Sequence, residues 1–321
     1  MAFYTGVCNS FDDMKAALIS CCVANGWTAT TDSGGKDVIY KGNLYVMLDT
    51  TTGTFNSFGI TGRTGVSIGS APGRVGISDF ISYQGNPTPG PVLFPVKYFC
   101  FTYSDIDEVY FLINYADMYQ WIAFGKSNIV LPGTGLWVAG TSGISGTSDA
   151  YRPATVIIDT LKTADAPAAT FATSAAMFWT CYMPRAGSSS YRTAAMNYWL
   201  HSNIDTSYPW SLASDNYYYG SPIGVQYLHT HLESQPNQFN QQSLLLPILA
   251  YYYSGPRLIA QIQKARHMMI NYIDPETIIY HGSEQWMVFP YLRKVYQSPY
   301  TFSLYMVNHT GNFGWAIKKE A

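Results

Sequence analysis

The first amphipathic segment lies near the start of the chain and has the spacing of an α-helix. Its apolar residues recur at intervals of three and four positions: Phe11, Met14, Leu18, Cys21 and Cys22. Ser10 stands before them and Asp13 follows three positions later, a pair typical of a helix N-cap. Asn25 and Gly26 supply a C-terminal stop. The pattern predicts a helix over residues 10–25.

Short strand-like segments dominate the rest of the chain. VIYKG, LYVMLDT and FNSFGIT are rich in β-branched and aromatic residues and are separated by turns, which indicates a β-meander. Between Val92 and Phe124, three apolar and aromatic runs predict three strands of one sheet. The glycine-rich segment from Gly59 to Gly76 is expected to form an extended loop. Later, SLLLPILAYY fits a helix or a strand, and WMVFPYL and GNFGWAIKKE fit strands.

Two stretches rich in glycine, proline and small residues divide the chain, at residues 84–91 and near residues 133–153. They predict three regions: residues 1–88 with the helix and β-meander, residues 92–140 with a middle β-sheet, and residues 150–321 with a β-rich assembly domain. The expected fold class is α+β, dominated by strands, with several small antiparallel sheets, an N-terminal helix and more than one domain.

Composition adds an expectation about the surface. Charged residues make up 12% of the chain against a usual ~25%, while aromatic residues reach 16%, with 27 tyrosines and 8 tryptophans. Tyr and Trp are enriched at protein interfaces, where charge is depleted. Much of the surface is therefore expected to be covered by partners. The net charge of -2 and the lack of basic runs argue against direct binding of nucleic acid or an anionic membrane.

Several features predict a soluble chain made in a cytoplasm. The start lacks the basic and apolar regions of a secretory signal. The most apolar stretch, residues 243–253, is shorter than the ~20 residues of a membrane span and contains Pro247. Five cysteines are an odd number without metal-ligand spacing, which favours buried free thiols: Cys8, Cys21, Cys22, Cys100 and Cys181.

His229 and His231 are the best candidates for a metal site. Strand alternation would place both, with Glu233, on one face. No third and fourth ligand follows at a set spacing, so a surface or interface pair is the competing interpretation. In a symmetric assembly, each subunit could donate both imidazoles to a shared ion on the axis. No other cofactor is expected.

The acidic clusters are weak candidates for catalysis. Asp105, Asp107 and Glu108 precede a predicted strand, and Asp274 and Glu276 flank a proline. A glycosidase needs two carboxylates about 5–10 Å apart across a cleft, which proximity in sequence does not show, and ordinary turn chemistry is the simpler explanation of these acids. Gly-Lys-Ser at residues 125–127 lacks the first glycine of a phosphate-binding loop, and no GxSxG motif occurs. The chain is not expected to be an enzyme.

A tyrosine-rich loop between Tyr208 and Pro222 is the strongest candidate for a binding surface. Its aromatic residues lie among Ser, Asn and Asp, as in adaptable binding surfaces: Tyr208, Trp210, Tyr217, Tyr218 and Tyr219. A buried aromatic cluster beneath a long loop is the alternative.

Several phrases of the sequence resemble tail-associated virion structural proteins of contractile-tailed bacteriophages. They are MKAALISCCVANGWT and VIYKGNLYVMLDT near the start, DIDEVYFLINYADMYQWIAFGKS and GTGLWVAG in the middle, and QKARHMMINYIDPETIIYHGSEQWMVFPYLRK and HTGNFGWAIKKE near the end. Residues 144–221 carry no part of this resemblance.

The resemblance implies a virion component of the tail, near the baseplate or the tube-sheath junction, without enzymatic activity. Its partners would be other tail proteins and copies of itself in a symmetric ring. The alternative function is a host-recognition or carbohydrate-binding tail module, for which the tyrosine-rich loop would be the contact surface.

Overall fold

The computed structural model describes residues 1–52, 56–67, 74–79, 91–144, 201–204, 238–239, 242–252, 257–291, 294 and 313–320. These residues form one helix, α1 (Phe11–Val23), and antiparallel sheets. Sheet A has the order β1 (Ala2–Cys8), β7 (Val96–Tyr103), β8 (Glu108–Tyr115), β9 (Met118–Lys126), β10 (Leu136–Gly140) and β12 (His201–Asn203).

Sheet B has the order β11 (Ser142–Ile144), β6 (Arg74–Ser78), β5 (Ser57–Arg63), β4 (Leu44–Thr51), β3 (Asp37–Lys41) and β2 (Thr28–Thr31). Sheet C has the order β15 (Leu246–Tyr252), β16 (Arg257–Met269), β19 (Phe313–Lys319), β18 (Glu284–Pro290) and β17 (Ile278–His281). A small pair joins β13 (Gln238–Phe239) to β14 (Gln242–Ser243). The predicted strand-dominated α+β class is confirmed.

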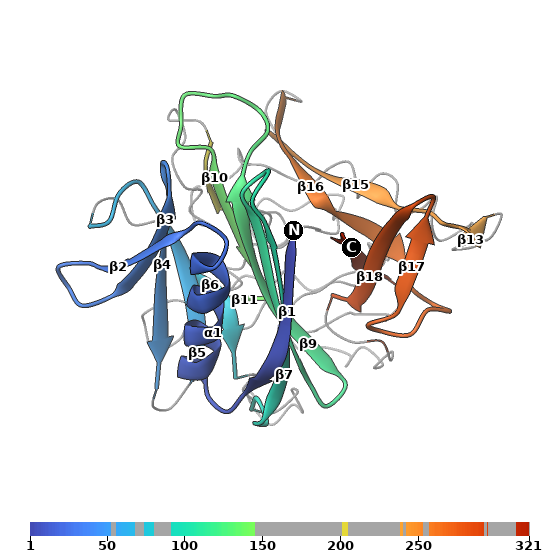
Figure 1. The fold of residues 1–321 in the computed structure, drawn as a ribbon, viewed down its shortest axis with the longest axis horizontal. Coiled ribbons are helices and arrows are strands. Elements are labelled where there is room, and N and C mark those ends of the chain that lie inside the picture. Colours follow the sequence, from blue (N-terminus) through green and yellow to red (C-terminus); the bar gives the residue numbers. More distant parts are fainter. Residues whose placement is uncertain are drawn as a thin grey trace, which may run out of the picture.

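Sheet A is the middle layer of the molecule (Figure 1). On one face, Phe111 of β8 packs edge-on against Phe58 of sheet B, with ring centroids 6.2 Å apart. On the other face, Trp121 of β9 packs against Trp315 of sheet C, with centroids 4.7 Å apart. One apolar cluster runs through sheet B, α1, sheet A and the inner face of sheet C. The central strands of sheet A are thus desolvated on both faces.

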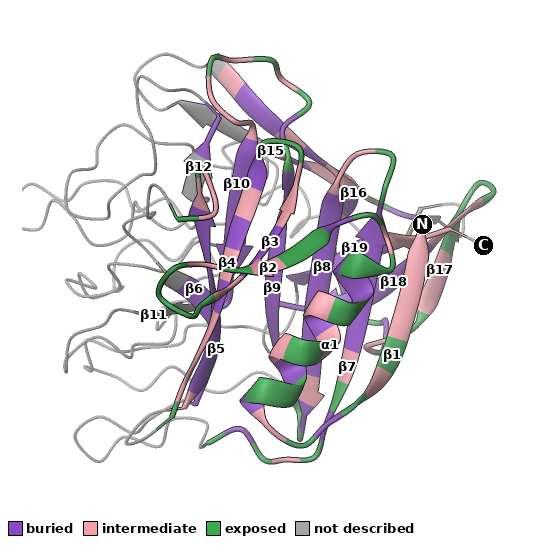
Figure 2. Cartoon of the chain, turned by 60° about the vertical axis from the view of Figure 1, so that its left-hand side comes forward, coloured by how far each residue is buried: buried purple, intermediate pink, exposed green. Residues whose placement is uncertain are grey.

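Burial on both faces explains the apolar runs between Val92 and Phe124. A strand that faces water on one side alternates apolar and polar residues, whereas a strand covered on both sides reads as a continuous apolar run. In β9, every residue from Met118 to Gly125 is buried (Figure 2). The prediction of three strands of one sheet is confirmed, since β7, β8 and β9 are consecutive neighbours.

The helix prediction is also confirmed. The Ser10 hydroxyl accepts a hydrogen bond from the Asp13 N–H at 3.0 Å, which satisfies one of the free N–H groups of the first turn. Gly26, with φ +86°, follows the helix end. The buried helical residues are the predicted ones, and they pack α1 against sheets A and B: Phe11, Met14, Leu18, Cys21 and Cys22.

The β-meander is confirmed in sheet B, but the extended loop from Gly59 to Gly76 is not. Both ends of that segment are strand, in β5 and β6. The glycines there serve close packing of two sheets. A Cβ on Gly140 of β10 would lie only 2.9 Å from the backbone nitrogen of Gly76 in β6. Sheets A and B can approach here because neither position carries a side chain.

The predicted break near residues 133–153 is wrong for residues 136–144, which form β10 and β11. The chain passes from sheet A to sheet B between these strands, at Thr141. The Thr141 hydroxyl accepts a hydrogen bond from the Trp121 N–H at 2.6 Å and donates one to the Trp121 carbonyl at 3.2 Å. The small residues that suggested a linker instead permit a sharp change of sheet.

Strand pairing joins segments from different predicted regions. β1, from residues 1–88, pairs along its whole length with β7, from residues 92–140. β11, which follows the middle region, pairs with β6 of the first. The three region boundaries stay predictions. Of the two interpretations of SLLLPILAYY, the described residues favour the strand, β15, and the strands predicted in WMVFPYL and GNFGWAIKKE are β18 and β19.

Replacing Phe289 by Ala tests the packing of sheet C on sheet A. Its ring is buried against Phe99, Phe101 and Tyr119 of sheet A. The cavity should lower the free energy of unfolding by about 3–5 kcal/mol, measured by urea denaturation. In the control, Tyr280→Ala removes a ring of sheet C that is 61% exposed, and the loss should stay below about 0.5 kcal/mol. Equal losses in the two variants would contradict the layered packing.

Candidate functional site

The strongest candidate residues from the sequence lie outside the part of the chain that the structure describes. These are His229 and His231 of the proposed metal pair, and the aromatic residues of the tyrosine-rich loop: Tyr208, Trp210, Tyr217, Tyr218 and Tyr219. Within the described ranges, no group of three or more His, Cys, Asp or Glu side chains has a metal-binding arrangement. No helix in those ranges is both long and apolar enough to cross a membrane.

Four cysteines cluster where α1 packs on sheet A, and they are buried and free as predicted: Cys8, Cys21, Cys22 and Cys100. Cys181 lies outside the described residues. Burial raises the pKa of Cys8 to about 12 and also raises the pKa values of Cys22 and Cys100. A hydrogen bond with Cys100 lowers the pKa of Cys21. Since the thiolate is the reactive form, Cys8, Cys22 and Cys100 are chemically quiet.

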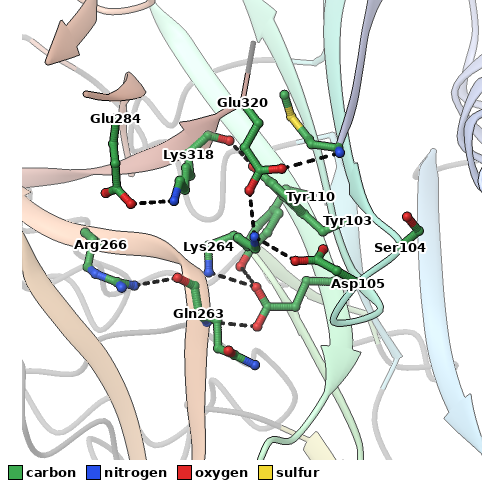
Figure 3. A network of polar contacts seen from close by, with 12 residues as sticks. Tyr103, Ser104, Asp105, Tyr110, Gln263, Lys264, Arg266, Glu284, Lys318 and Glu320 are labelled. Atoms are coloured by element: carbon green, nitrogen blue, oxygen red, sulfur yellow. Dashed lines mark hydrogen bonds and ion pairs between the residues drawn. The ribbon is translucent and has the colours of Figure 1, made fainter. Parts of the chain in front are cut away.

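Glu108 is a fully buried acid that takes part in a network of polar contacts between sheets A and C. Figure 3 shows this network with Tyr110, Gln263 and Lys264 labelled. Glu108 is the first residue of β8 and projects toward sheet C. Its Oε1 accepts a hydrogen bond from the Gln263 N–H at 2.8 Å, and its Oε2 accepts one from the Lys264 N–H at 3.0 Å. The Tyr110 hydroxyl donates to Oε2 at 2.7 Å. The interpretation of Glu108 as an ordinary turn acid is therefore wrong.

The two backbone donors are available because β16 is irregular at this point. Pro247 of β15 pairs with Arg266, but the next residue, Ile248, pairs with Ile262. Residues 263–265 therefore have no partner in β15. Such a bulge releases N–H groups from the ladder, and buried N–H groups need another acceptor. Glu108 supplies that acceptor from the neighbouring sheet.

Arg266 fixes the same bulge from within sheet C. Its Nη1 donates to the backbone carbonyls of Ile262, Gln263 and Ala265, at 3.2, 2.8 and 2.8 Å. Its guanidinium group also lies over the Trp286 ring, 5.2 Å from the centroid. The bulge therefore has its released carbonyls bound by Arg266 and its released N–H groups bound by Glu108.

Ion pairs surround the buried carboxylate. Lys264 Nζ lies 2.9 Å from an oxygen of Asp105 and 2.7 Å from one of Glu320. Burial opposes the charge of Lys264, but hydrogen bonds with Glu320 and Asp105 outweigh this and raise its pKa. The Lys264 hydrogen bond lowers the pKa of Glu320. The Tyr103 hydroxyl donates to the carbonyl of Lys318. Loops and strands of sheets A and C are thus joined around Glu108.

Burial sets the ionisation of Glu108. It raises the pKa of this carboxyl to about 7, against the opposing effect of hydrogen bonds from Gln263, Tyr110 and Lys264. A carboxyl with a pKa near neutrality is a common mark of an active site. A general base must however reach a substrate proton, and Glu108 is fully buried with three protein donors on its oxygens. The position of Glu108 therefore suits a hydrogen-bonded connection between sheets A and C better than it suits catalysis.

Two further polar side chains join layers. Gln120 of β9 exchanges two hydrogen bonds with the backbone of Ser78 in sheet B, at 3.0 and 2.7 Å. The Ser127 hydroxyl, next to β9, donates to the carbonyl of Ile259 in sheet C at 2.5 Å. Ser127 belongs to the Gly-Lys-Ser segment, so its hydroxyl is engaged in packing and not presented to a phosphate.

Sequence reasoning missed Gln120 and Ser127, and it assigned Glu108 to a turn. One signal was present for Glu108 and Gln120: each is a polar residue within or beside an apolar run. In a strand covered on both faces, such a residue must find a partner in an adjacent layer.

No protein-family model matches the chain, and no curated protein matches it.

Substituting Glu108 by Gln tests the buried carboxylate through pH. The pKa of Glu108 is about 7 in the folded chain against an ordinary value of 4.5 for a glutamate carboxyl, so folding favours its protonated form. Its contribution to stability is full below pH 4.5 and is lost as pH rises through about 7. The free energy of unfolding of wild type minus E108Q should fall by about 3 kcal/mol between about pH 4 and pH 8.

Glu284→Gln is a control with the opposite sign. The hydrogen bond from Lys318 lowers the pKa of Glu284, so its contribution is present above the unfolded pKa and is lost as pH falls. Its difference curve should therefore change on the acid side only. Urea denaturation at a series of pH values measures both variants. If the difference in free energy of unfolding between wild type and E108Q does not change with pH, the pKa of Glu108 is not raised by folding and this prediction is wrong.

Proposed function

We propose that this chain is a structural subunit of a bacteriophage tail, at the baseplate or the tube-sheath junction, where it joins neighbouring tail proteins. The phrases that resemble tail proteins run from α1 to β19 and include β8, β9 and β10 of sheet A and β17, β18 and β19 of sheet C. They therefore include part of the core, such as the contact between Trp121 and Trp315.

The observation that carries the proposal is the use made of buried polar groups. Glu108 and Ser127 bind sheet A to sheet C, and Gln120 binds sheet A to sheet B. An active site needs polar groups that converge on a space for a substrate. Here the buried polar groups converge on the backbone of the next layer, which suits a part whose task is to keep its shape.

The role would be mechanical. Antiparallel ladders, a core shared by three layers and hydrogen-bonded cross-links give a body that transmits strain without unfolding locally. Such a subunit holds tail pieces in register, together with copies of itself in a symmetric ring. Its low content of charged residues suits broad interfaces with other proteins. Neither a catalytic step nor a cofactor is part of this proposal.

The direct experiment is to locate the chain in purified particles of the phage that encodes it. We expect mass spectrometry to detect it in tails at a fixed ratio to the tube protein, and a cryo-EM map to contain its three layers in the tail. Its absence from washed particles that still infect would contradict the proposal.

Replacing Tyr217, Tyr218 and Tyr219 by Ala distinguishes the proposed function from host recognition. If the chain is a structural subunit whose tyrosine-rich loop contacts neighbouring tail proteins, this variant should fail during assembly. Particles that assemble fully but no longer attach to cells would instead favour a host-recognition module. Electron microscopy and an adsorption assay on the same preparation separate these results, and wild-type particles are the control.

A further inference from the structure

The ends of the three sheets differ in how they are protected against pairing with another chain. An edge strand presents free backbone N–H and C=O groups, which form a template for a further strand. Among the described residues, the sheets end in these strands: β1 and β12 in sheet A, β2 and β11 in sheet B, and β15 and β17 in sheet C.

Five of these six edge strands have a feature that discourages pairing with a strand of another chain. β2 and β17 have four residues each, and β11 and β12 have three each, so they offer little length for pairing. β15 is longer, but it contains Pro247 and its register with β16 shifts twice. Proline removes a backbone donor and register shifts bend the edge, and both discourage a regular added strand.

β1 has none of these features. It is seven residues long, contains no proline and no charged side chain, and pairs with β7 in unbroken register from Ala2 to Cys8. Figure 2 shows it at the border of the central sheet, with α1 over one face. Thr5 is exposed, and Val7 is 62% exposed. The strand is thus a regularly paired, uncharged edge with exposed side chains at Thr5 and Val7.

We propose that β1 pairs with β1 of a second copy of this chain, antiparallel, across a two-fold axis at Thr5. The backbone of β1 requires an extended strand as its partner, since only such a strand matches its row of donors and acceptors. The two copies of sheet A would then continue into one another, with both helices on the same side.

The side chains of β1 suit this self-pairing. An axis at Thr5 places Phe3 opposite Val7 of the partner and Tyr4 opposite Gly6 of the partner. Pairs of an aromatic with a β-branched residue are favourable across strands. Gly6 is already covered by the ring of Tyr98 in β7, and it has no side chain of its own that could clash with Tyr4 of the partner. Thr5 faces its own copy, and its hydroxyl already donates to the Tyr98 carbonyl at 2.8 Å, so the threonine pair brings no unpaired donor into the contact. No like charges meet, because the strand has none.

The pairing rests on the edge of β1 and does not depend on a place in a virion. A two-fold contact is closed and uses one surface twice. If the copies also form a ring, the same contact joins two rings in a dihedral assembly. Failure to find the chain in particles would thus leave this inference intact, and a monomeric chain could still be a tail subunit.

The first test measures the mass of the full chain in solution by sedimentation equilibrium. Wild type should reach twice 35.7 kDa as its concentration rises. Thr5→Lys places two positive charges opposite each other and should raise the Kd of the dimer by about tenfold or more. Val130→Lys adds the same charge at a residue that is 96% exposed and follows β9, which β7 and β8 separate from β1, and it should leave the Kd unchanged. Circular dichroism and urea unfolding check that both variants fold.

The second test depends on the position of the axis. Thr5→Lys and Thr5→Glu should each be weak dimers alone, but a mixture should form a heterodimer at least as tight as wild type, because the opposite charges then face each other. A monomeric wild type would overturn the proposal. So would a dimer that T5K leaves unchanged, or a mixture that shows no recovery.

Discussion

The structure depends on the burial of both faces of sheet A. A sheet that is dry on both sides gains apolar contact from two layers, but every polar group on its strands must then be satisfied within the protein. Glu108 and Gln120 show both halves of this constraint. Each occupies a position where an apolar side chain would suffice for packing, and each instead binds the backbone of an adjacent layer. The layers are thereby fixed in one relative position, which apolar contact alone does not specify.

The same constraint accounts for the unusual composition. The excess of aromatic residues suggested a surface covered by partners, but most of the described aromatic side chains are buried in the core. The largest fully buried side chains are Trp121, Trp137, Trp315, Tyr103, Tyr110, Tyr291, Phe58, Phe101, Phe111, Phe124 and Phe289. Two interlayer spaces need large rings to fill them, and two-sided burial leaves few strand positions for charge. A low charge content therefore follows in part from the fold itself.

Features that depend on residues close together in the sequence could be predicted, whereas features that depend on contacts between distant residues could not. The helix at Phe11–Val23 depends on a local cap and a local period, and the sequence shows both. The runs of β7, β8 and β9 are also local, so the strands were predictable. The roles of Gly76 and Gly140 were not, because their meaning arises from a contact between two sheets. Glu108 is the same case: the bulge that gives it two donors lies about 155 positions away in the chain.

Two-sided burial also restricts how copies of this chain can associate. Among the described residues, the central strands of sheet A are covered on both faces, so a partner can meet this sheet at its edge strands. One end of sheet A is the three-residue β12, and the other is β1. Charged residues commonly protect an edge strand from pairing with another chain. A chain whose strands are mostly buried on both faces has few charged residues in its strands, edge strands included. The scarcity of charged residues in the strands therefore has two consequences. It allows the three layers to pack into one core, and it leaves the edge of β1 without charged residues that would prevent the proposed contact between copies.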